Sequence, residues 1–181
     1  ETGGQGGSHP SNYLDYPYST GALNWTGDTS VIFPADAPSL GGFITSHVVP
    51  RAELFKVGQL SPGDKFHFRQ ISFETALDMR RLQDEYLQAV GRLASGDATF
   101  VKPLNLKRPT ERGKTVSHAI LGTYKNITIR QAGDSYLLVE FPQSLDLDVR
   151  CKVQGVVEAL RSASTRGVRL ITPMACSKSS V

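Results

Sequence analysis

The sequence predicts an α+β protein in which a β-rich first part is followed by one long amphipathic helix and a small β-β-α-β unit. Three observations carry this prediction: a turn-rich beginning with short apolar runs, a breaker-free stretch with apolar residues at three-four spacing, and two strand-like runs joined by a glycine turn. They divide the chain into a β-rich part, a helix, a linker and an α+β part, at residues 1–71, 72–94, 95–117 and 118–181.

The β-rich part is predicted from short extended runs between turns. The composition of residues 1–30 is rich in Gly, Ser, Asn, Asp and Tyr, which is typical of ordered loops. Residues 31–33 and 44–49 are expected to be extended, and residues 53–60 to form a short amphipathic stretch. Residues 65–71 alternate polar and apolar side chains, which predicts a half-buried strand.

The clearest prediction is a helix over residues 73–94 with Ser72 as its cap. The stretch holds few helix breakers, and its apolar side chains recur at three-four spacing at Leu82, Tyr86, Ala89, Val90 and Leu93. The carboxylates on this helix are expected to form surface contacts with Arg80 and Arg81 rather than to act as acid and base. They are Asp78, Asp84 and Glu85.

After the linker, residues 126–130 and 136–141 are predicted to be the strands of a hairpin with Gly133 in its turn. Residues 146–162 carry an apolar helical stripe, and residues 167–171 are expected to close the unit as a strand. So small a unit needs more sheet or a partner to bury both faces. Its open edges therefore predict self-association into a homo-oligomer.

Composition excludes several classes of protein. The chain has 181 residues and a net charge of +3, and no apolar run is long enough to span a membrane. The linker is basic, but Phe100 is its one neighbouring aromatic residue for stacking on bases, so nucleic-acid binding is not expected. Glycine-rich phosphate loops and a nucleophile elbow are absent, and the four His residues are scattered, so no metal site is predicted.

Two cysteines, Cys151 and Cys176, are placed where they could pair. The first falls near the start of a predicted helix and the second just past the strand expected after it. A helix and the following strand usually run antiparallel when their connection is short, which brings these two ends together. The spacing therefore allows a disulfide, and two free thiols in a cytosolic protein are the alternative.

Further features bear on the cellular compartment. Glu1, Thr2 and Gly3 look like the remnant of a vector's secretion signal. Sequons at Asn24 and Asn126 would accept glycans in a secretory compartment. With the two cysteines, these features predict an extracellular, secreted protein, and a cytoplasmic location is the alternative.

Polar residues gather among glycines in the first part, where they could hold a small polar substrate. Carboxylates accept from N–H groups, amides both donate and accept, and glycines let the backbone approach an anion. The alternative is that these side chains form turns and caps that close loops. The candidates are His9, Asn12, Asp15, Asn24, Asp28 and Ser39, and none is assigned a catalytic role.

Longer motifs, in the same order, resemble the carboxyltransferase region of fungal and bacterial urea carboxylase, the carboxylase half of urea amidolyase. In the first part they are GGSHPSN, GALNWTGD, PSLGGF and ELFKVGQL, at residues 6–12, 21–28, 38–43 and 53–60. In the second part, RQAGDSYLLVE at residues 130–140 continues the match. The same pair of modules is similar to the allophanate hydrolase-subunit-like, Kip-type subunits of bacterial 5-oxoprolinase.

This resemblance implies a carboxyltransferase that moves CO2 from carboxybiotin to urea, in a protein that also carries biotin carboxylase and biotin carrier domains. It implies two modules that each contain a cyclophilin-like β-barrel, with this chain covering the end of one and the start of the next. Biotin would be attached to the separate carrier domain, and no cofactor is expected on this chain. The polar candidates would then hydrogen-bond to urea or to the ureido group of biotin.

Two functional hypotheses follow. In the first, a truncated module that is non-catalytic alone has been repurposed as a secreted binding protein with an unknown protein partner, for example a fungal effector or surface antigen. In the second, the chain is a fragment of a biotin-dependent urea carboxylase that contributes to the urea and carboxybiotin pocket. The short length and the two cysteines favour the first hypothesis slightly.

Overall fold

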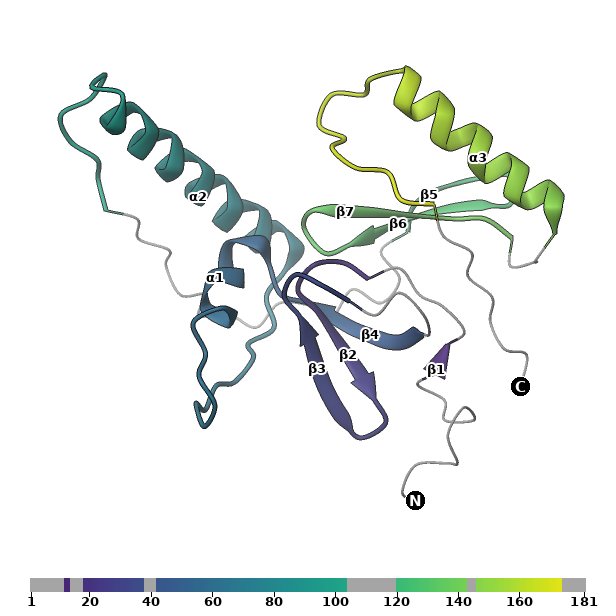
Figure 1. Ribbon diagram of the computed structural model, residues 1–181, viewed down its shortest axis with the longest axis horizontal. Helices are drawn as coiled ribbons and strands as arrows, with labels where there is room; N and C mark the ends of the chain where they lie inside the picture. Colours follow the sequence, from purple (N-terminus) through teal and green to yellow (C-terminus); the bar gives the residue numbers. More distant parts are fainter. Residues whose placement is uncertain (1–11, 14–17, 38–41, 104–119, 143–145, 174–181) are drawn as a thin grey trace.

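The computed structural model describes residues 12–13, 18–37, 42–103, 120–142 and 146–173. Helices and strands are mixed, as the sequence predicts, and the described strands form two small antiparallel sheets (Figure 1). In chain order the elements are β1 (Asn12–Tyr13), β2 (Ala22–Thr26), β3 (Thr29–Phe33), β4 (Gly42–Val48), the 3₁₀ helix η1 (Arg51–Glu53), α1 (Leu54–Val57), α2 (Phe73–Ala94), β5 (Ile120–Tyr124), β6 (Ile127–Ala132), β7 (Tyr136–Glu140) and α3 (Leu147–Ser162).

The first sheet has the strand order β1-β4-β2-β3. Gly27 and Asp28 make the tight turn between β2 and β3, and Gly27 adopts a φ of +74° that favours glycine. The composition of residues 1–30 indicates ordered loops, and within this stretch residues 22–26 form the strand β2. This five-residue strand buries Ala22 and Leu23, but it is short, and turn-forming residues dominate the composition around it.

Residues 65–71 form no strand, although their alternation predicts one. Phe66 and Phe68 are each 53% exposed, and their rings pack edge-on with centroids 5.3 Å apart. Alternation stabilises a strand where a neighbouring strand supplies the ladder hydrogen bonds, and no strand of the described sheets pairs with this segment. The amphipathic stretch just before it is helical, as η1 and α1.

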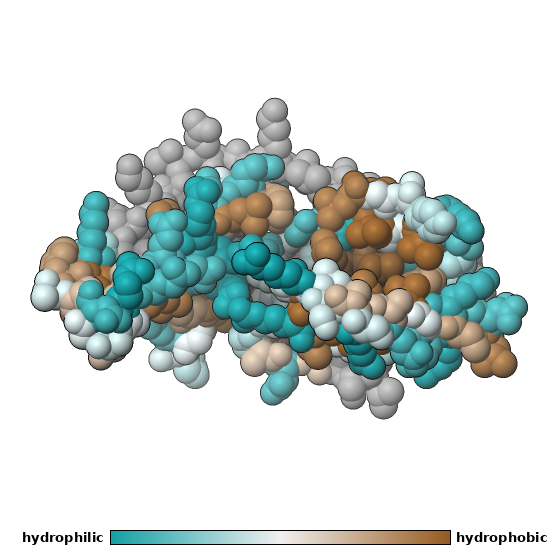
Figure 2. Space-filling view, turned by 90° about the horizontal axis from the view of Figure 1, so that it is seen from above, coloured by the Kyte–Doolittle hydropathy of each residue, from teal (hydrophilic) through white to brown (hydrophobic). Residues whose placement is uncertain are grey.

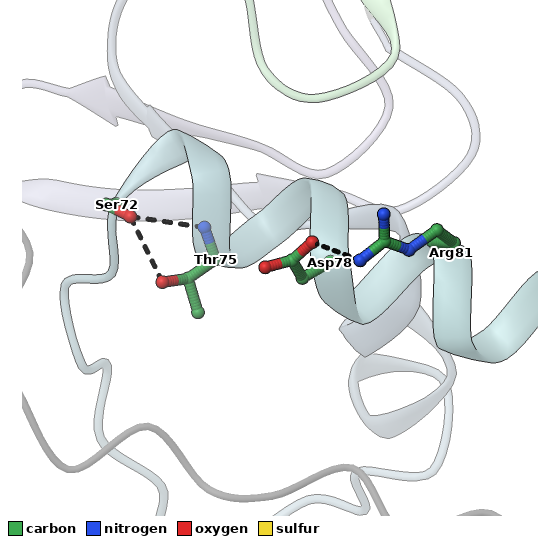
Figure 3. Close-up of polar contacts among 4 residues, drawn as sticks. All are labelled: Ser72, Thr75, Asp78 and Arg81. Carbon is green, nitrogen blue, oxygen red and sulfur yellow. Dashed lines mark hydrogen bonds and ion pairs between the residues drawn. The ribbon is translucent and has the colours of Figure 1, made fainter.

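The predicted long helix is confirmed as α2, with both ends where the sequence places them. The Ser72 hydroxyl accepts the backbone N–H of Thr75 at 3.1 Å and so caps the first turn (Figure 3). Ala76 and Met79 are buried, and the helix packs on η1. The apolar stripe of its second half is not covered by the described residues, since Leu82, Val90 and Leu93 are exposed.

The second sheet has the order β5-β6-β7, with α3 lying over it (Figure 1). The predicted hairpin is confirmed as β6 and β7, with Gly133 in its turn at a φ of +68°. β5, which pairs with the other edge of β6, was not foreseen from the sequence. α3 is capped by the Asp146 carboxylate, which accepts the backbone N–H of Asp148 at 3.0 Å.

The strand expected at residues 167–171 is absent. Gly167 ends a turn with a φ of +92°, and the following residues take an irregular path with Val168 and Leu170 exposed. This apolar run is too short to hold a strand without pairing, and the described edge strands do not extend to it. The described part of the predicted β-β-α-β unit is therefore β-β-β-α.

The described residues bury a small hydrophobic core, made of Ala22, Leu23, Ala52, Ala76, Met79 and Val157. Larger apolar side chains are exposed on the second sheet and around α3, among them Leu121, Leu137, Val139, Leu147 and Leu170. Figure 2 shows apolar surface on the side where α3 and the second sheet lie, and hydrophilic surface over α2. The described strands form open sheets, so the cyclophilin-like barrel stays a prediction. Among these residues, no helix has both the length and the hydrophobicity that crossing a bilayer requires.

Candidate functional site

Asn24 occupies the middle of β2, and its side chain is fully buried. Its Nδ2 donates to the backbone carbonyl of Ala22 at 2.9 Å, and its Oδ1 accepts the Thr45 hydroxyl of β4 at 2.5 Å. Both polar atoms of the amide are therefore occupied: Nδ2 by the main chain of β2 itself and Oδ1 by the hydroxyl that joins β2 to β4. Direct contact with a substrate, or attachment of a glycan at this sequon, would require the two strands to separate.

Asp28, in contrast, is exposed in the β2–β3 turn. The turn is reinforced by the Thr26 hydroxyl, which donates to the backbone carbonyl of Thr29 at 3.3 Å. A rigid two-residue turn holds the carboxylate at the tip of the hairpin, where it can accept N–H groups from a ligand. The Asp28 side chain is therefore open to solvent, whereas that of Asn24 is buried.

The remaining predicted residues are placed only in part. Asn12 lies in β1, which pairs with β4 through Phe43, so its backbone belongs to the same sheet as Asn24. Three further candidates lie outside the described residues, and their role stays a prediction: His9, Asp15 and Ser39. The sheet therefore brings together the chain segments of Asn12, Asn24 and Asp28.

Asp134, at the tip of the β6–β7 hairpin, was not singled out by the sequence. It is 8% exposed, and its carboxylate accepts the backbone N–H of Arg51 with both oxygens, at 3.2 and 3.3 Å. Arg51 is the first residue of η1 and follows Pro50, which has no N–H to offer. A carboxylate at this position caps the start of η1, where its negative charge is stabilised by the backbone N–H groups that point out of this end.

The residues around Asp134 join the two sheets, and we call this contact region the hairpin junction (residues 19–20, 48–51, 80 and 132–136). The Arg80 guanidinium donates to the backbone carbonyl of Asp134 and, at 3.4 Å, to the Ser135 hydroxyl. The Tyr136 and Thr20 hydroxyls are hydrogen-bonded at 2.8 Å, and the Ser19 hydroxyl donates to the Ala132 carbonyl at 3.4 Å. Figure 1 shows the hairpin tip beside the start of α2 and the first sheet.

Arg80 and Arg81 therefore have different partners, although they are neighbours on α2. Arg81 forms the surface ion pair that the sequence predicts, with Asp78 at 2.8 Å (Figure 3). The Arg80 side chain extends away from α2 and donates to a turn 54 residues further along the chain. Only the Gly-Asp pair in the predicted hairpin turn hinted at a special role for this turn, and nothing in the sequence indicated its partner.

The sequence also predicts a glycan acceptor at Asn126 and a pair of cysteines, and the structure describes these positions in part. Asn126 is exposed in the β5–β6 turn, where a glycan would be accommodated. Cys151 is exposed on α3, while Cys176 lies outside the described residues, so their pairing stays a prediction. Within the described ranges, no three His, Cys, Asp or Glu side chains are grouped closely enough to hold a metal ion.

Comparison with known proteins identifies the relatives of this chain. The family model for the carboxyltransferase domain, subdomain A and B, matches residues 2–70. The urea amidolyase of Lachancea kluyveri is 37% identical over 174 residues, and a putative urea carboxylase of Emericella nidulans is 37% identical over 172 residues. The urea amidolyase of Saccharomyces cerevisiae is 36% identical over 173 residues. The predicted resemblance to the carboxyltransferase region of urea carboxylase is confirmed.

The match to urea carboxylase covers 90–92% of this chain but only 9–14% of the relatives' own length. It extends through both sheets, whereas the carboxyltransferase family model ends before α2. No solved structure matches the chain significantly.

Proposed function

We propose that this chain is part of the carboxyltransferase of a biotin-dependent urea carboxylase and contributes to the pocket for urea and carboxybiotin. The observation that carries the proposal is the 36–37% identity to urea amidolyase and urea carboxylase over at least 90% of the chain. The family model for a carboxyltransferase domain supports the same reading for the part that holds the polar candidates. The comparisons favour this hypothesis over a secreted binding protein.

Biotin on a separate carrier domain would supply an activated carboxyl group for transfer to a urea nitrogen, with a urea proton returning to biotin in exchange. Urea and the ureido ring of biotin both present N–H donors beside a carbonyl acceptor. The exposed Asp28 carboxylate suits such N–H donors. The buried Asn24–Thr45 pair supports it by holding β2, which leads into the Asp28 turn, against β4.

In this proposal the biotin carboxylase and biotin carrier domains are the partners, and the chain itself holds no cofactor. The two open sheets are portions of cyclophilin-like barrels that further strands of the carboxyltransferase region complete. Among the described residues no strand pairs with the outer edge of β7, and Leu137 and Val139 on this strand are exposed; both observations support this part of the proposal.

A chimaera of the Saccharomyces cerevisiae urea amidolyase tests the proposal, with residues 2–173 of this chain in place of the matching segment. The rate of ATP hydrolysis is measured with and without urea, and the parent enzyme serves as the reference. The urea-independent rate reports whether the biotin carboxylase part still works. We expect urea to accelerate ATP hydrolysis in the chimaera. A chimaera with a normal urea-independent rate and no response to urea contradicts the proposal.

The secreted binding protein is the alternative function, which the comparisons do not support; it would need an accessible Asn126 acceptor and an accessible Cys151, and both residues are exposed. Intact mass of the natively produced protein, with and without reductant, separates the two functions. A glycan together with a reducible bond between Cys151 and Cys176 would favour secretion. Free thiols and an unmodified mass would remove the support for it.

A further inference from the structure

We propose that the turn between β6 and β7 positions the carboxyl-transfer site, with Asp134 and Arg80 as its positioning residues. The role in carboxyl transfer rests on the proposed function, while the docking of the turn on the first sheet stands on the contacts alone. Neither residue is one of the polar candidates, and neither has to touch a substrate in order to act.

The turn docks at one end of the β2–β4 strand pair. Ala22 at the start of β2 lies opposite Val48 at the end of β4, and the Val49 N–H donates to the Gly21 carbonyl at 2.8 Å. The Thr20 hydroxyl, just before β2, accepts the hydrogen bond of the Tyr136 hydroxyl of the second sheet at 2.8 Å. The hairpin junction therefore lies at the start of β2 and at the end of β4.

The approach of the turn to β4 is close enough to require glycine. A Cβ placed on Gly133 would lie 2.8 Å from Cγ1 and 3.2 Å from Cβ of Val48, and the residue has a φ of +68°. Contacts this short leave no room for the turn to slide on β4. The glycine therefore fixes how near the second sheet lies to the first.

Asp134 and Arg80 fix the orientation of the turn as well as its distance. The buried Asp134 carboxylate needs donors, and it finds them in the Arg51 N–H and the Ser135 hydroxyl. Arg80 holds the main chain of the same residue through the Asp134 carbonyl. One residue of the turn is thus held by η1 through its side chain and by α2 through its backbone.

This arrangement reaches the candidate site through β2. The strand begins at the hairpin junction, carries the Asn24–Thr45 hydrogen bond in its middle and ends at the turn with Asp28. In this proposal, loosening the junction releases the start of β2 and displaces the polar groups at its other end that the proposed function assigns to urea; a misplacement of about 1 Å can cost on the order of a hundredfold in rate.

Two substitutions on α2 form a matched pair for the test. Arg80→Met removes the donors to the hairpin turn but keeps a long side chain, whereas Arg81→Met removes the surface pair with Asp78. Hydrogen exchange of the full chain is measured at the amides of Val49, Arg51 and Ala52. The KM for urea is measured in the chimaera that carries the same substitution.

We expect Arg80→Met to speed exchange at these amides and to raise the urea KM by about tenfold or more, with an unchanged urea-independent rate of ATP hydrolysis. A purely structural loss of folded enzyme lowers kcat without changing KM, so the rise in KM reports positioning. Arg81→Met is expected to change neither quantity, and Arg80→Lys, which keeps a donor, to recover most of the urea affinity.

Equal exchange in the Arg80→Met and Arg81→Met proteins would overturn the docking of the turn. Faster exchange with an unchanged urea KM would overturn its role in positioning. A parent chimaera that does not respond to urea would instead contradict the proposed function, and with it the role in carboxyl transfer. In that case the exchange comparison still decides whether the junction holds the two sheets together.

Discussion

The carboxylate of Asp134 accepts the backbone N–H of Arg51, although 83 residues separate the two in the chain. The contact ties the turn of the second sheet to the start of η1, which directly follows the first sheet. Because Pro50 offers no N–H, Arg51 presents the first donor of this helical segment. The two sheets are therefore joined by a specific polar contact and not by the linker alone.

Asp134→Ala is expected to destabilise the protein by about 1–3 kcal/mol, because it leaves the Arg51 N–H without an acceptor at a partly buried site. Denaturant unfolding followed by circular dichroism measures the change. Asp78→Ala, which removes an exposed ion pair on α2, is the control and should cost less than about 1 kcal/mol. Equal effects of the two substitutions would contradict the capping role.

Gly133→Ala and Gly96→Ala separate backbone strain from steric contact. Both glycines have a positive φ, but a Cβ at Gly96 meets no atom within 4 Å, whereas one at Gly133 collides with Val48. We expect backbone strain to lower the free energy of unfolding by about 1–2 kcal/mol at either site. At Gly133 the collision with Val48 should lower it by about a further 1–3 kcal/mol. In thermal unfolding, adding Val48→Ala to Gly133→Ala should restore part of the loss, and no such recovery would argue against the close contact.

Asn24→Ala is expected to cost about 1–3 kcal/mol, because it leaves the Thr45 hydroxyl without its acceptor inside the first sheet. If Asn24 and Thr45 act as a pair, the loss from Asn24→Ala should shrink in a Thr45→Val background. A double-mutant cycle in denaturant unfolding measures this coupling. Additive effects would show that Asn24 does not stabilise the strand pair through Thr45.

Ser72→Ala should lower stability by about 1 kcal/mol, since the first turn of α2 loses the acceptor for the Thr75 N–H. Ser72→Asp keeps an acceptor at the same position and should retain nearly all of the stability. Helical circular dichroism during thermal unfolding compares the two. A Ser72→Asp protein as unstable as Ser72→Ala would contradict capping as the cause.

Local signals account for the parts of the fold that the sequence predicted. α2 combines a Ser cap with a long apolar repeat, and the β6–β7 hairpin combines two strand-like runs with a glycine turn, so each is specified by neighbours in the chain. Residues 65–71 and 167–171 carry strand-like patterns, but no described strand pairs with either segment, and both are irregular. A strand depends on a distant partner that its own residues do not encode.

The candidate site residues also differ in whether neighbours in the chain or distant segments set their surroundings. Asn24 was chosen for its amide, but its burial and its bond to Thr45 depend on the pairing of β2 with β4. Asp28 lies in a turn set by adjacent residues, and it is exposed as a ligand-binding carboxylate needs to be. Asp134 and Arg80 were missed as partners because their contact spans 54 residues and uses a backbone carbonyl, which leaves no sequence pattern.

The response of ATP hydrolysis to urea in the chimaeric urea amidolyase tests the central claim most directly, namely that this chain serves carboxyl transfer to urea. We predict a rate that rises with urea concentration and saturates, over an unchanged urea-independent rate. A chimaera whose urea-independent rate is intact, but whose ATP hydrolysis is the same with and without urea, would contradict the claim.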